Sequence, residues 1–463
     1  MAEQLPSLES VATINADGSR KFVHPADVHG RFSRLRAWTG WLLILIYAAL
    51  PWIPVNGNPA VFLDFASRQV HLFGLTFVPQ DFWLAFFLVT GLGFSLFYIT
   101  AVVGRVWCGW TCPQTVFIEL VFRPIECLIE GRAPQRRLLD ASPWTPTKIA
   151  RRTTKWTLYA ILSVAIAHIF VSYFISIPEL YAIMHRSPLE NWGLFTFVFL
   201  LSAVIFFDFT WFREQFCIVL CPYGRLQSVL LDNDSVVIGY DRKRGEPRGK
   251  LLAAGAGDCI DCHRCVQVCP TGIDIRQGLQ IECIACANCI DACDEIMTKV
   301  GRPRGLVRYD STNGLEGQKT RYIRPRTILY TILLGIGTVV MLLSLSTLGT
   351  ATATVLRMPG FPYFMYEGKI RNQYLLRIEN KRNQPVHFNV QLATDLPGIT
   401  ISGAENGIDV PALGQQSRPI VVIIPATSYH GTFTAEFVVS TSDFHAVKSA
   451  PFLGPDVDMN LGQ

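Results

Sequence analysis

Residues 259–270 read CIDCHRCVQVCP, and residues 283–293 read CIACANCIDAC. Each run places three cysteines at C-x2-C-x2-C spacing and a fourth after three more residues. In two-cluster bacterial ferredoxins, each cubane cluster takes three thiolates from one run and its fourth from the other. The spacing therefore predicts two 4Fe-4S clusters. Their predicted ligands are Cys259, Cys262, Cys265 and Cys293 for one, and Cys283, Cys286, Cys289 and Cys269 for the other.

A pair of zinc sites is the alternative, because C-x2-C is also a zinc spacing. Zinc has no use for the third cysteine that follows two residues later in both runs. Asp294 stands where the ferredoxin motif has a proline, but that proline is not a ligand, so the prediction of clusters is unchanged. Eight of the thirteen cysteines crowd into residues 259–293, which indicates metal binding and not disulfides.

The rest of the chain predicts membrane helices. Half of the 463 residues are apolar and only 17% are charged, which is unusual for a soluble protein. Five stretches are long enough for a span of about 20 residues. They are residues 37–55, 81–103, 156–177, 192–211 and 327–348. A buried core helix is the alternative for any one of them, but five charge-poor stretches together favour an integral membrane protein.

Positive charge predicts the orientation. Arg and Lys are abundant in residues 105–155 and 213–326, whereas Arg68 and Arg186 are the only ones in the two short alternate loops. The positive-inside rule then places the N-terminus and both long loops in the cytoplasm and the C-terminal tail in the periplasm. The net charge of +5 reflects this topology, and nucleic acid is not an expected partner. The polar N-terminus has no signal-peptide pattern, so we expect it to be retained.

The tail predicts a separate β domain. Short β-branched or alternating runs at residues 374–378, 386–392, 419–424 and 432–439 are separated by turn clusters. This spacing is typical of an immunoglobulin-like β-sandwich. The predicted organisation is a cytoplasmic segment (1–36), four membrane helices (37–231), a ferredoxin-like domain (232–326), a fifth helix (327–350) and the β domain (351–463).

A second cysteine pattern occurs twice. Residues 108–113 (the first motif) read CGWTCP and residues 217–222 (the second motif) read CIVLCP, each after a pair of predicted spans and an arginine. The duplication predicts two halves that meet at one site. If each motif is one continuous helix, its two thiols share a face. If each proline instead begins a new helix, Cys112 and Cys221 lie at helix N-termini, where the dipole favours thiolate.

Inert packed cysteines are the alternative for these motifs, but their duplication favours a functional site. Soft thiolates select Cu(I), zinc or iron–sulfur centres. The candidate catalytic and metal-binding residues are Cys108, Cys112, Cys217 and Cys221. Cys127 lies outside the pattern and is expected to be structural.

Four further residues are weaker candidates. His168 lies within the third predicted span, where an interhelical hydrogen bond is its expected role. Asp208 is expected to pair with Arg213. Met184 and His185 on an outer loop are possible copper contacts, but two residues are little evidence.

The order of these motifs resembles the CcoG family, also called FixG or RdxA. The membrane core, with residues 108–113 and the CIVLCPYG of residues 217–224, is also similar to polyferredoxin membrane proteins such as NapH, from which the β domain distinguishes it. The resemblance implies an inner-membrane cytochrome c oxidase accessory protein that reduces Cu(II) to Cu(I) during assembly of cbb-type oxidases. Copper-transport or oxidase-assembly proteins would be its partners.

We therefore hypothesise a metalloreductase. Electrons from a cytoplasmic donor would pass through both clusters to copper at the thiols of the first and second motifs. A quinone-linked electron conduit to a partner redox protein is one alternative. A non-enzymatic scaffold for oxidase assembly is another.

Overall fold

The computed structural model describes residues 13, 20–251, 253, 255–346 and 348–455. The chain forms two compact units. One comprises Met1–Pro54, Pro59–Phe73 and Asp81–Met341, and the other Val55–Asn58, Gly74–Gln80 and Leu342–Gln463. The expectation of a retained polar N-terminus concerns residues that mostly lie outside the described ranges.

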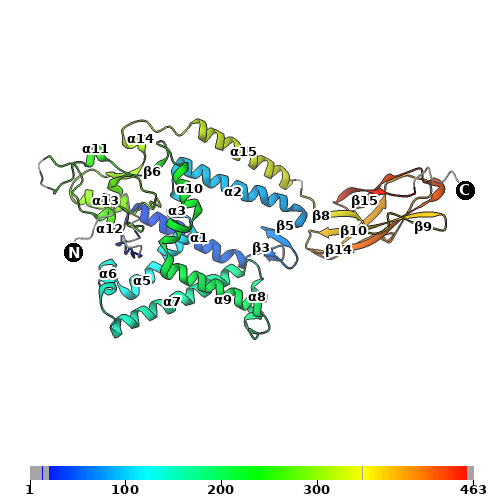
Figure 1. Cartoon of the computed structure of the whole chain (residues 1–463), viewed down its shortest axis with the longest axis horizontal. Coiled ribbons are helices and arrows are strands. Elements are labelled where there is room, and N and C mark those ends of the chain that lie inside the picture. Colours follow the sequence, from blue (N-terminus) through cyan, green and yellow to red (C-terminus); the bar gives the residue numbers. More distant parts are fainter. Residues whose placement is uncertain (1–12, 14–19, 252, 254, 347, 456–463) are drawn as a thin grey trace. The chain divides into compact units, whose positions relative to one another are not determined.

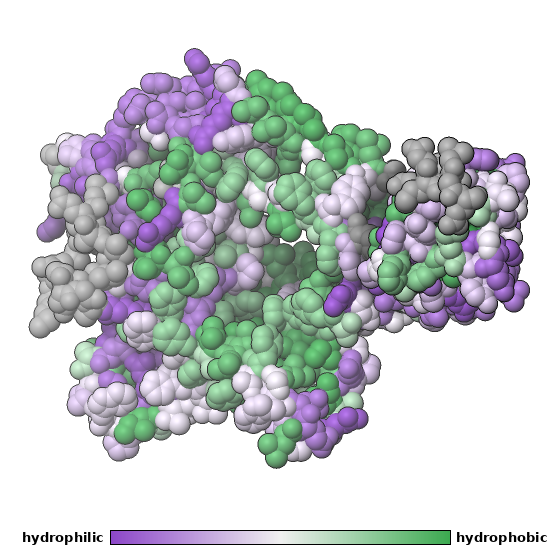
Figure 2. Space-filling view, turned by 45° about the vertical axis from the view of Figure 1, so that its right-hand side comes forward, coloured by the Kyte–Doolittle hydropathy of each residue, from purple (hydrophilic) through white to green (hydrophobic). Residues whose placement is uncertain are grey.

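Five helices in the described ranges are long and apolar enough to cross a membrane. They are α1 (Arg31–Ala49) with its 3₁₀ extension η1 (Leu50–Trp52), α2 (Phe82–Val103), α7 (Pro146–Val171), α9 (Trp192–Phe207) with its π-helical extension η4 (Asp208–Phe212), and α15 (Pro325–Ser346) (Figure 1). Their apolar side chains are largely exposed, and Thr327 is the buried residue of α15. Figure 2 shows a large hydrophobic surface on this face of the molecule, and exposed apolar surface of this extent is typical of membrane or protein contact.

The helix boundaries differ from the predicted spans, most of all for the third. Helix α7 begins at Pro146, ten residues before the predicted residue 156, and ends at Val171 instead of 177. The Thr145 side chain caps α7 by accepting a hydrogen bond from the backbone N–H of Lys148. The basic residues that follow are good helix formers, so the helix continues where hydropathy falls. Helix α1 likewise begins at Arg31 and not at residue 37; the other three spans shift by one or two residues.

Shorter helical segments connect the long ones. They are α3 (Val106–Trp110), α4 (Pro113–Phe117), the π-helix η3 (Ile118–Phe122), α5 (Arg123–Glu130), α6 (Ala133–Ala141), α8 (Ile177–Met184), the π-helix η5 (Phe216–Leu220) and α10 (Pro222–Leu230). Single-turn π-helices are rare and occur frequently at functional sites. Here η3 follows the first motif, η4 precedes the second, and η5 includes part of the second motif.

The cysteine-rich insert begins and ends at one pair of strands. Strands β6 (Val236–Tyr240) and β7 (Val307–Ser311) pair antiparallel, with Val236 opposite Ser311. Between them lie α11 (Arg242–Gly245), α12 (Arg264–Gln267), η6 (Ile275–Gln277) and α13 (Asn288–Lys299), and α14 (Thr312–Leu315) follows.

The insert is joined to the membrane helices at the start of α1 (Figure 1). In α13, the Asp291 carboxylate accepts hydrogen bonds from the backbone N–H groups of Phe32 (3.2 Å) and Ser33 (2.7 Å). These are among the N–H groups that a helix N-terminus leaves without an intrahelical partner. The insert thus caps the first membrane helix.

The segment between α1 and α2 contains short strands. They are β1 (Pro54–Val55), β2 (Asn58–Pro59), β3 (Val61–Asp64), β4 (Gln69–Leu72) and β5 (Leu75–Phe77), followed by η2 (Pro79–Asp81). Strand β3 pairs antiparallel with β4, and Val61 lies opposite Leu72.

The C-terminal unit contains two β-sheets. One has the strand order β12-β14-β10-β8, with β9 also paired to β10, and the other has the order β13-β11-β15-β16. The strands are β8 (Ala351–Arg357), β9 (Phe364–Tyr366), β10 (Lys369–Asn380), β11 (Val386–Leu392), β12 (Thr400–Ser402), β13 (Ile408–Val410), β14 (Gln415–Pro425), β15 (Phe433–Ser440) and β16 (His445–Phe452), with η7 at Ala426–Ser428. All four predicted runs fall on strands, and their inward residues, such as Tyr374 and Phe437, form the core.

Candidate metal centres

The cysteine-rich insert gathers its eight cysteines around two cavities. Cys269, Cys283, Cys286 and Cys289 line one, together with Cys265 and with apolar side chains such as Ile273 and Ile275. Cys259, Cys262, Cys265 and Cys293 line the other. The four thiols that the spacing assigns to one cubane cluster therefore line one cavity, and Cys265 lies between the two cavities.

The two cysteine loops have the same backbone geometry. Asp261 and His263 in one, and Ala285 and Ala287 in the other, all have φ between 53° and 63°. They occupy equivalent positions, two and four residues after the first cysteine of each run. This left-handed conformation is uncommon for residues with a side chain. It winds each loop around its cavity before α12 or α13 begins.

Burial raises the pKa of six of the insert thiols in the metal-free chain, those of Cys265, Cys269, Cys283, Cys286, Cys289 and Cys293. It raises the pKa of Cys283 to about 12 and that of Cys286 to about 11. Cluster insertion must therefore displace protons from these thiols. Among the described residues, no three or more Cys, His, Asp or Glu side chains are grouped for a single metal ion. A cubane cluster is wider than one ion, so its thiolates stand further apart.

In both C-x3-C-P motifs the proline begins a new helix. Pro113 is the first residue of α4 and Pro222 the first of α10, so Cys112 and Cys221 are the N-cap residues. The continuous-helix interpretation is therefore wrong. Cys108 lies in α3 and Cys217 in the π-helix η5.

The four motif thiols of the two halves influence one another's pKa, although no three of them are grouped for a single metal ion in the described residues. Burial raises the pKa of Cys217, and the neighbouring thiols of Cys112, Cys108 and Cys221 raise it further. Burial also raises the pKa of Cys108 to about 11, with Cys112 adding to the increase and Arg105 opposing it.

The expected thiolate at Cys112 is not favoured in the metal-free chain. Burial raises its pKa, although the backbone N–H groups of Thr115 and Gln114 at the helix terminus lower it. The effect of burial on the pKa of Cys112 is larger than that of the helix terminus. Metal-ion binding at this thiol must therefore also release a proton.

The two copies of the internal repeat share a backbone feature. Gly104 (φ 64°) and Arg213 (φ 46°) both have positive φ, and each lies four residues before the first cysteine of its motif. Arg213 therefore occupies the position of Gly104 in the repeat. Its buried guanidinium lies 2.5 Å from a Glu126 oxygen and 3.6 Å from a Glu214 oxygen.

Two residues of α10 at the thiol site were missed by sequence reasoning. The Cys108 thiol donates to Oε1 of the fully buried Gln227 (3.3 Å). A Cβ on Gly224 would lie 2.8 Å from the Cys217 carbonyl oxygen, so only glycine lets α10 approach η5 this closely. The CPYG sequence at residues 221–224 is a signal for the glycine, but no local pattern identifies Gln227.

Two of the weaker predictions are wrong. His168 Nδ1 donates to the Val164 carbonyl (2.7 Å) in its own helix and not to another helix. The Arg213 side chain pairs with Glu126 and Glu214, whereas Asp208 Oδ1 has no hydrogen-bond partner in the structure.

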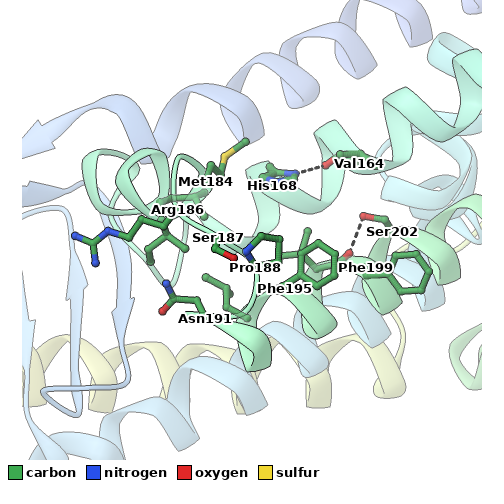
Figure 3. A pocket seen from close by; sticks show the side chains of 14 residues that line it. Val164, His168, Met184, Arg186, Ser187, Pro188, Asn191, Phe195, Phe199 and Ser202 are labelled. Carbon is green, nitrogen blue, oxygen red and sulfur yellow. Dashed lines mark hydrogen bonds between the residues drawn. The ribbon is translucent and has the colours of Figure 1, made fainter.

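The other weaker candidates lie away from the thiols. His168 and Met184 line a largely apolar pocket of about 330 Å³ between α7, α8 and α9 (Figure 3). His185 Nδ1 bonds to the carbonyl of Tyr181 in α8. Cys127 is half-buried in α5.

Comparison with known proteins agrees with this architecture. The 4Fe-4S dicluster domain family matches residues 212–312, a 4Fe-4S binding domain family matches residues 82–133, and the family of the IG-like fold at the C-terminus of FixG matches residues 341–455. The match at residues 82–133 includes the first motif.

Three relatives are similar over much of the chain. Protein RdxA of Cereibacter sphaeroides is 37% identical, covering 84% of this chain and 86% of RdxA. Protein RdxB of the same organism is 36% identical, covering 87% of this chain and 89% of RdxB. Nitrogen fixation protein FixG of Rhizobium meliloti is 41% identical, covering 63% of this chain and 57% of FixG.

The apolar helices, the two cysteine quartets and these matches define a membrane-bound iron–sulfur electron-transfer protein. Within that class, the chain belongs to the FixG/RdxA family.

Proposed function

We propose that this protein is a membrane-bound cupric reductase that serves the assembly of a cbb-type cytochrome c oxidase. Its substrate is Cu(II), which accepts one electron and becomes Cu(I). The eight insert cysteines hold the two 4Fe-4S clusters, a cytoplasmic carrier supplies the electron, and copper-transport or oxidase-assembly proteins take the product.

The observation that carries this proposal is the convergence of four thiols from two halves of the chain beside the insert. Cys112 and Cys221 raise the pKa of Cys108, and Cys112, Cys108 and Cys221 raise that of Cys217, which supports a shared site for the four thiols. Thiolates are soft ligands that favour Cu(I). A site that binds copper and prefers its reduced form is suited to reducing Cu(II).

The orientation is part of the proposal. The basic residues of Pro146–Lys155 at the start of α7, and those of the insert, support a cytoplasmic location for both cysteine sites. The C-terminal β domain then lies in the periplasm.

The test is cupric reduction by purified protein with Cys108→Ser and Cys112→Ser, measured with a Cu(I)-specific chelator. We expect reduction to fall to the level of a protein-free control while iron content and the EPR signals of both clusters stay unchanged. Cys127→Ser is the matched control, since Cys127 is half-buried but outside the motifs, and it should reduce copper at the wild-type rate. Undiminished reduction by the double variant would show that these thiols are not the site.

The quinone-linked alternative has less support. The pocket that contains His168 is the largely apolar space that suits such a ligand. It surrounds the Trp192 end of α9, however, whereas η5 and Cys217 follow the other end. The lining of the pocket extends along α9 to Ser202, and from Ser202 to Phe212 the rise is about 15 Å at 1.5 Å per residue. None of the residues that line this pocket is a cysteine.

A further inference from the structure

One cysteine loop of the insert lies directly against the first motif. An added Cβ on Gly109 would lie 2.5 Å from the Ile284 carbonyl oxygen and 2.8 Å from Cα of Cys286. Gly109 directly follows Cys108, and Cys286 belongs to the loop of residues 283–289. The backbone of the copper-site motif therefore contacts the backbone of a cluster-binding loop, with no room for a side chain between them.

Side chains reinforce the same contact. Trp110 Nε1 donates to the Tyr309 hydroxyl (3.1 Å), which donates to the Ala285 carbonyl (2.6 Å). Arg105 donates from Nη1 to the carbonyl of Ile281 and, at 3.4 Å, to that of Cys283. These contacts connect Trp110 of the first motif, and Arg105 just before the motif, with the 283–289 loop or its start.

Helix α1 holds the loop from another side. Arg36 Nη1 donates to the Cys286 carbonyl (3.3 Å) and to Asn288 Oδ1 (3.1 Å), while its Nη2 pairs with Glu119 (2.9 Å). Arg36 is buried, so this loop is fixed between α1, α3 and η3.

The other quartet includes the cysteine that reaches solvent. All thirteen cysteines lie in the described ranges, and among them only Cys262 is exposed. Cys262 lines the cavity shared with Cys259, Cys265 and Cys293. The two clusters therefore have different surroundings, one next to the first motif and one at the protein surface.

We infer that the two clusters act in a fixed order, and that Gly109 is the positioning residue of the junction between them and the copper site. The quartet with Cys262 accepts one electron from a reduced one-electron carrier protein. The quartet with Cys286 passes that electron across the Gly109 contact to the Cu(II) substrate, which becomes Cu(I); the transfer itself forms or breaks no bond. This inference rests on the proposed function.

The experiment compares Gly109→Ala with Gly93→Ala in full-length, cluster-loaded protein. The Gly93 control adds the same methyl group to a helix, but no atom lies within 4 Å of its new Cβ. The first readout needs no copper: a redox-poised EPR titration of both clusters. The signal that disappears in Cys286→Ser belongs to the cluster at the junction, and the signal that disappears in Cys262→Ser belongs to the surface cluster.

We expect Gly109→Ala to shift the midpoint reduction potential of the junction cluster and not that of the surface cluster, because the methyl group displaces the 283–289 loop from Arg105 and α3. The second readout is single-turnover oxidation of dithionite-reduced clusters by Cu(II), which should slow by about tenfold, as displaced reaction partners do. Gly93→Ala should leave both values unchanged. If Gly109→Ala lowers the yield of folded protein, Trp110→Phe, which removes the Nε1–H donor, tests the same junction.

Two results would overturn the inference. One is that Gly109→Ala shifts the midpoint reduction potential of the surface cluster and leaves that of the junction cluster unchanged. The other is rapid oxidation by Cu(II) in Cys286→Ser together with none in Cys262→Ser. A wild-type protein whose clusters are not oxidised by Cu(II) would instead refute the proposed function, and the copper-free titration would still decide the position of the junction.

Discussion

The backbone conformation of Arg213 and the ion pairs of its side chain both shape the segment that leads into the second motif. Its φ of 46° is uncommon for a non-glycine residue, and such conformations persist where the surroundings hold them in place. The surroundings here are the carboxylates of Glu126 and Glu214, and Arg123 also pairs with Glu214 at 3.0 Å. The buried ion pairs thus fix the segment that leads into the second motif.

Glu126→Gln tests this ion cluster. Burial alone would raise the pKa of Glu126, but Arg213, Lys155 and Arg136 lower it from 4.5 to about 2. Removal of one partner from a buried ion pair costs about 3–5 kcal/mol, so the variant should unfold at a lower temperature near neutral pH. The exposed Glu190→Gln is the control and should match wild type.

The difference in thermal stability between wild type and Glu126→Gln should depend on pH in a definite direction. A carboxylate with a depressed folded-state pKa stabilises fully above its unfolded pKa, and that stabilisation disappears as the pH falls through the folded pKa. The difference between wild type and Glu126→Gln should be constant from neutral pH to about 4.5 and shrink from there toward about 2. Thermal unfolding across this range measures it, and a difference that grows with acidity would contradict the assignment.

At the scale of elements, the sequence predicts what is local. Apolar windows locate all five long helices, and the four cysteines that the spacing assigns to one cluster line one cavity, although Cys265 lines both cavities. The extension of α7 back to Pro146 was missed, because Lys and Arg lower hydropathy without stopping a helix. The contacts of Gly109 with Cys286 and of Cys108 with Gln227 join distant residues, and no periodicity encodes them.

Gly224→Ala tests the contact between α10 and η5. The added Cβ would lie 2.8 Å from the Cys217 carbonyl oxygen, so one of the two helices must move. We expect the separation of Cys217 from the other three motif thiols to lower the amount of Cu(I) bound per protein several-fold. Iron content should not change. Gly193→Ala in α9, where a Cβ has no neighbour within 4 Å, should bind copper as wild type does.

At the scale of the whole molecule, the chain combines three chemical environments. The long helices expose apolar side chains, the insert surrounds two cysteine-lined cavities, and the C-terminal unit is a β-sandwich with an apolar core. An electron path between the insert and the thiols of the first and second motifs, as proposed above, would use all the cysteines that occur in patterns.

The proposed orientation predicts the behaviour of reporter fusions. Alkaline phosphatase, which is active only outside the cytoplasm, should be inactive when fused after Lys250 in the insert and active when fused after Pro455. Green fluorescent protein at the same two positions should give the reverse pattern. Activity of the phosphatase at Lys250 would invert the topology and place the clusters outside.

The cap that Asp291 provides to α1 has a consequence for the order of biosynthesis. Phe32 leaves the ribosome 259 residues before the carboxylate that satisfies its backbone N–H. The cap on the first of the long helices therefore cannot form until α13, which contains Cys289 and Cys293, has been translated and has folded. Completion of the membrane domain is in this way linked to maturation of the metal-binding insert, so that a chain with an unfinished insert also has an unfinished first helix.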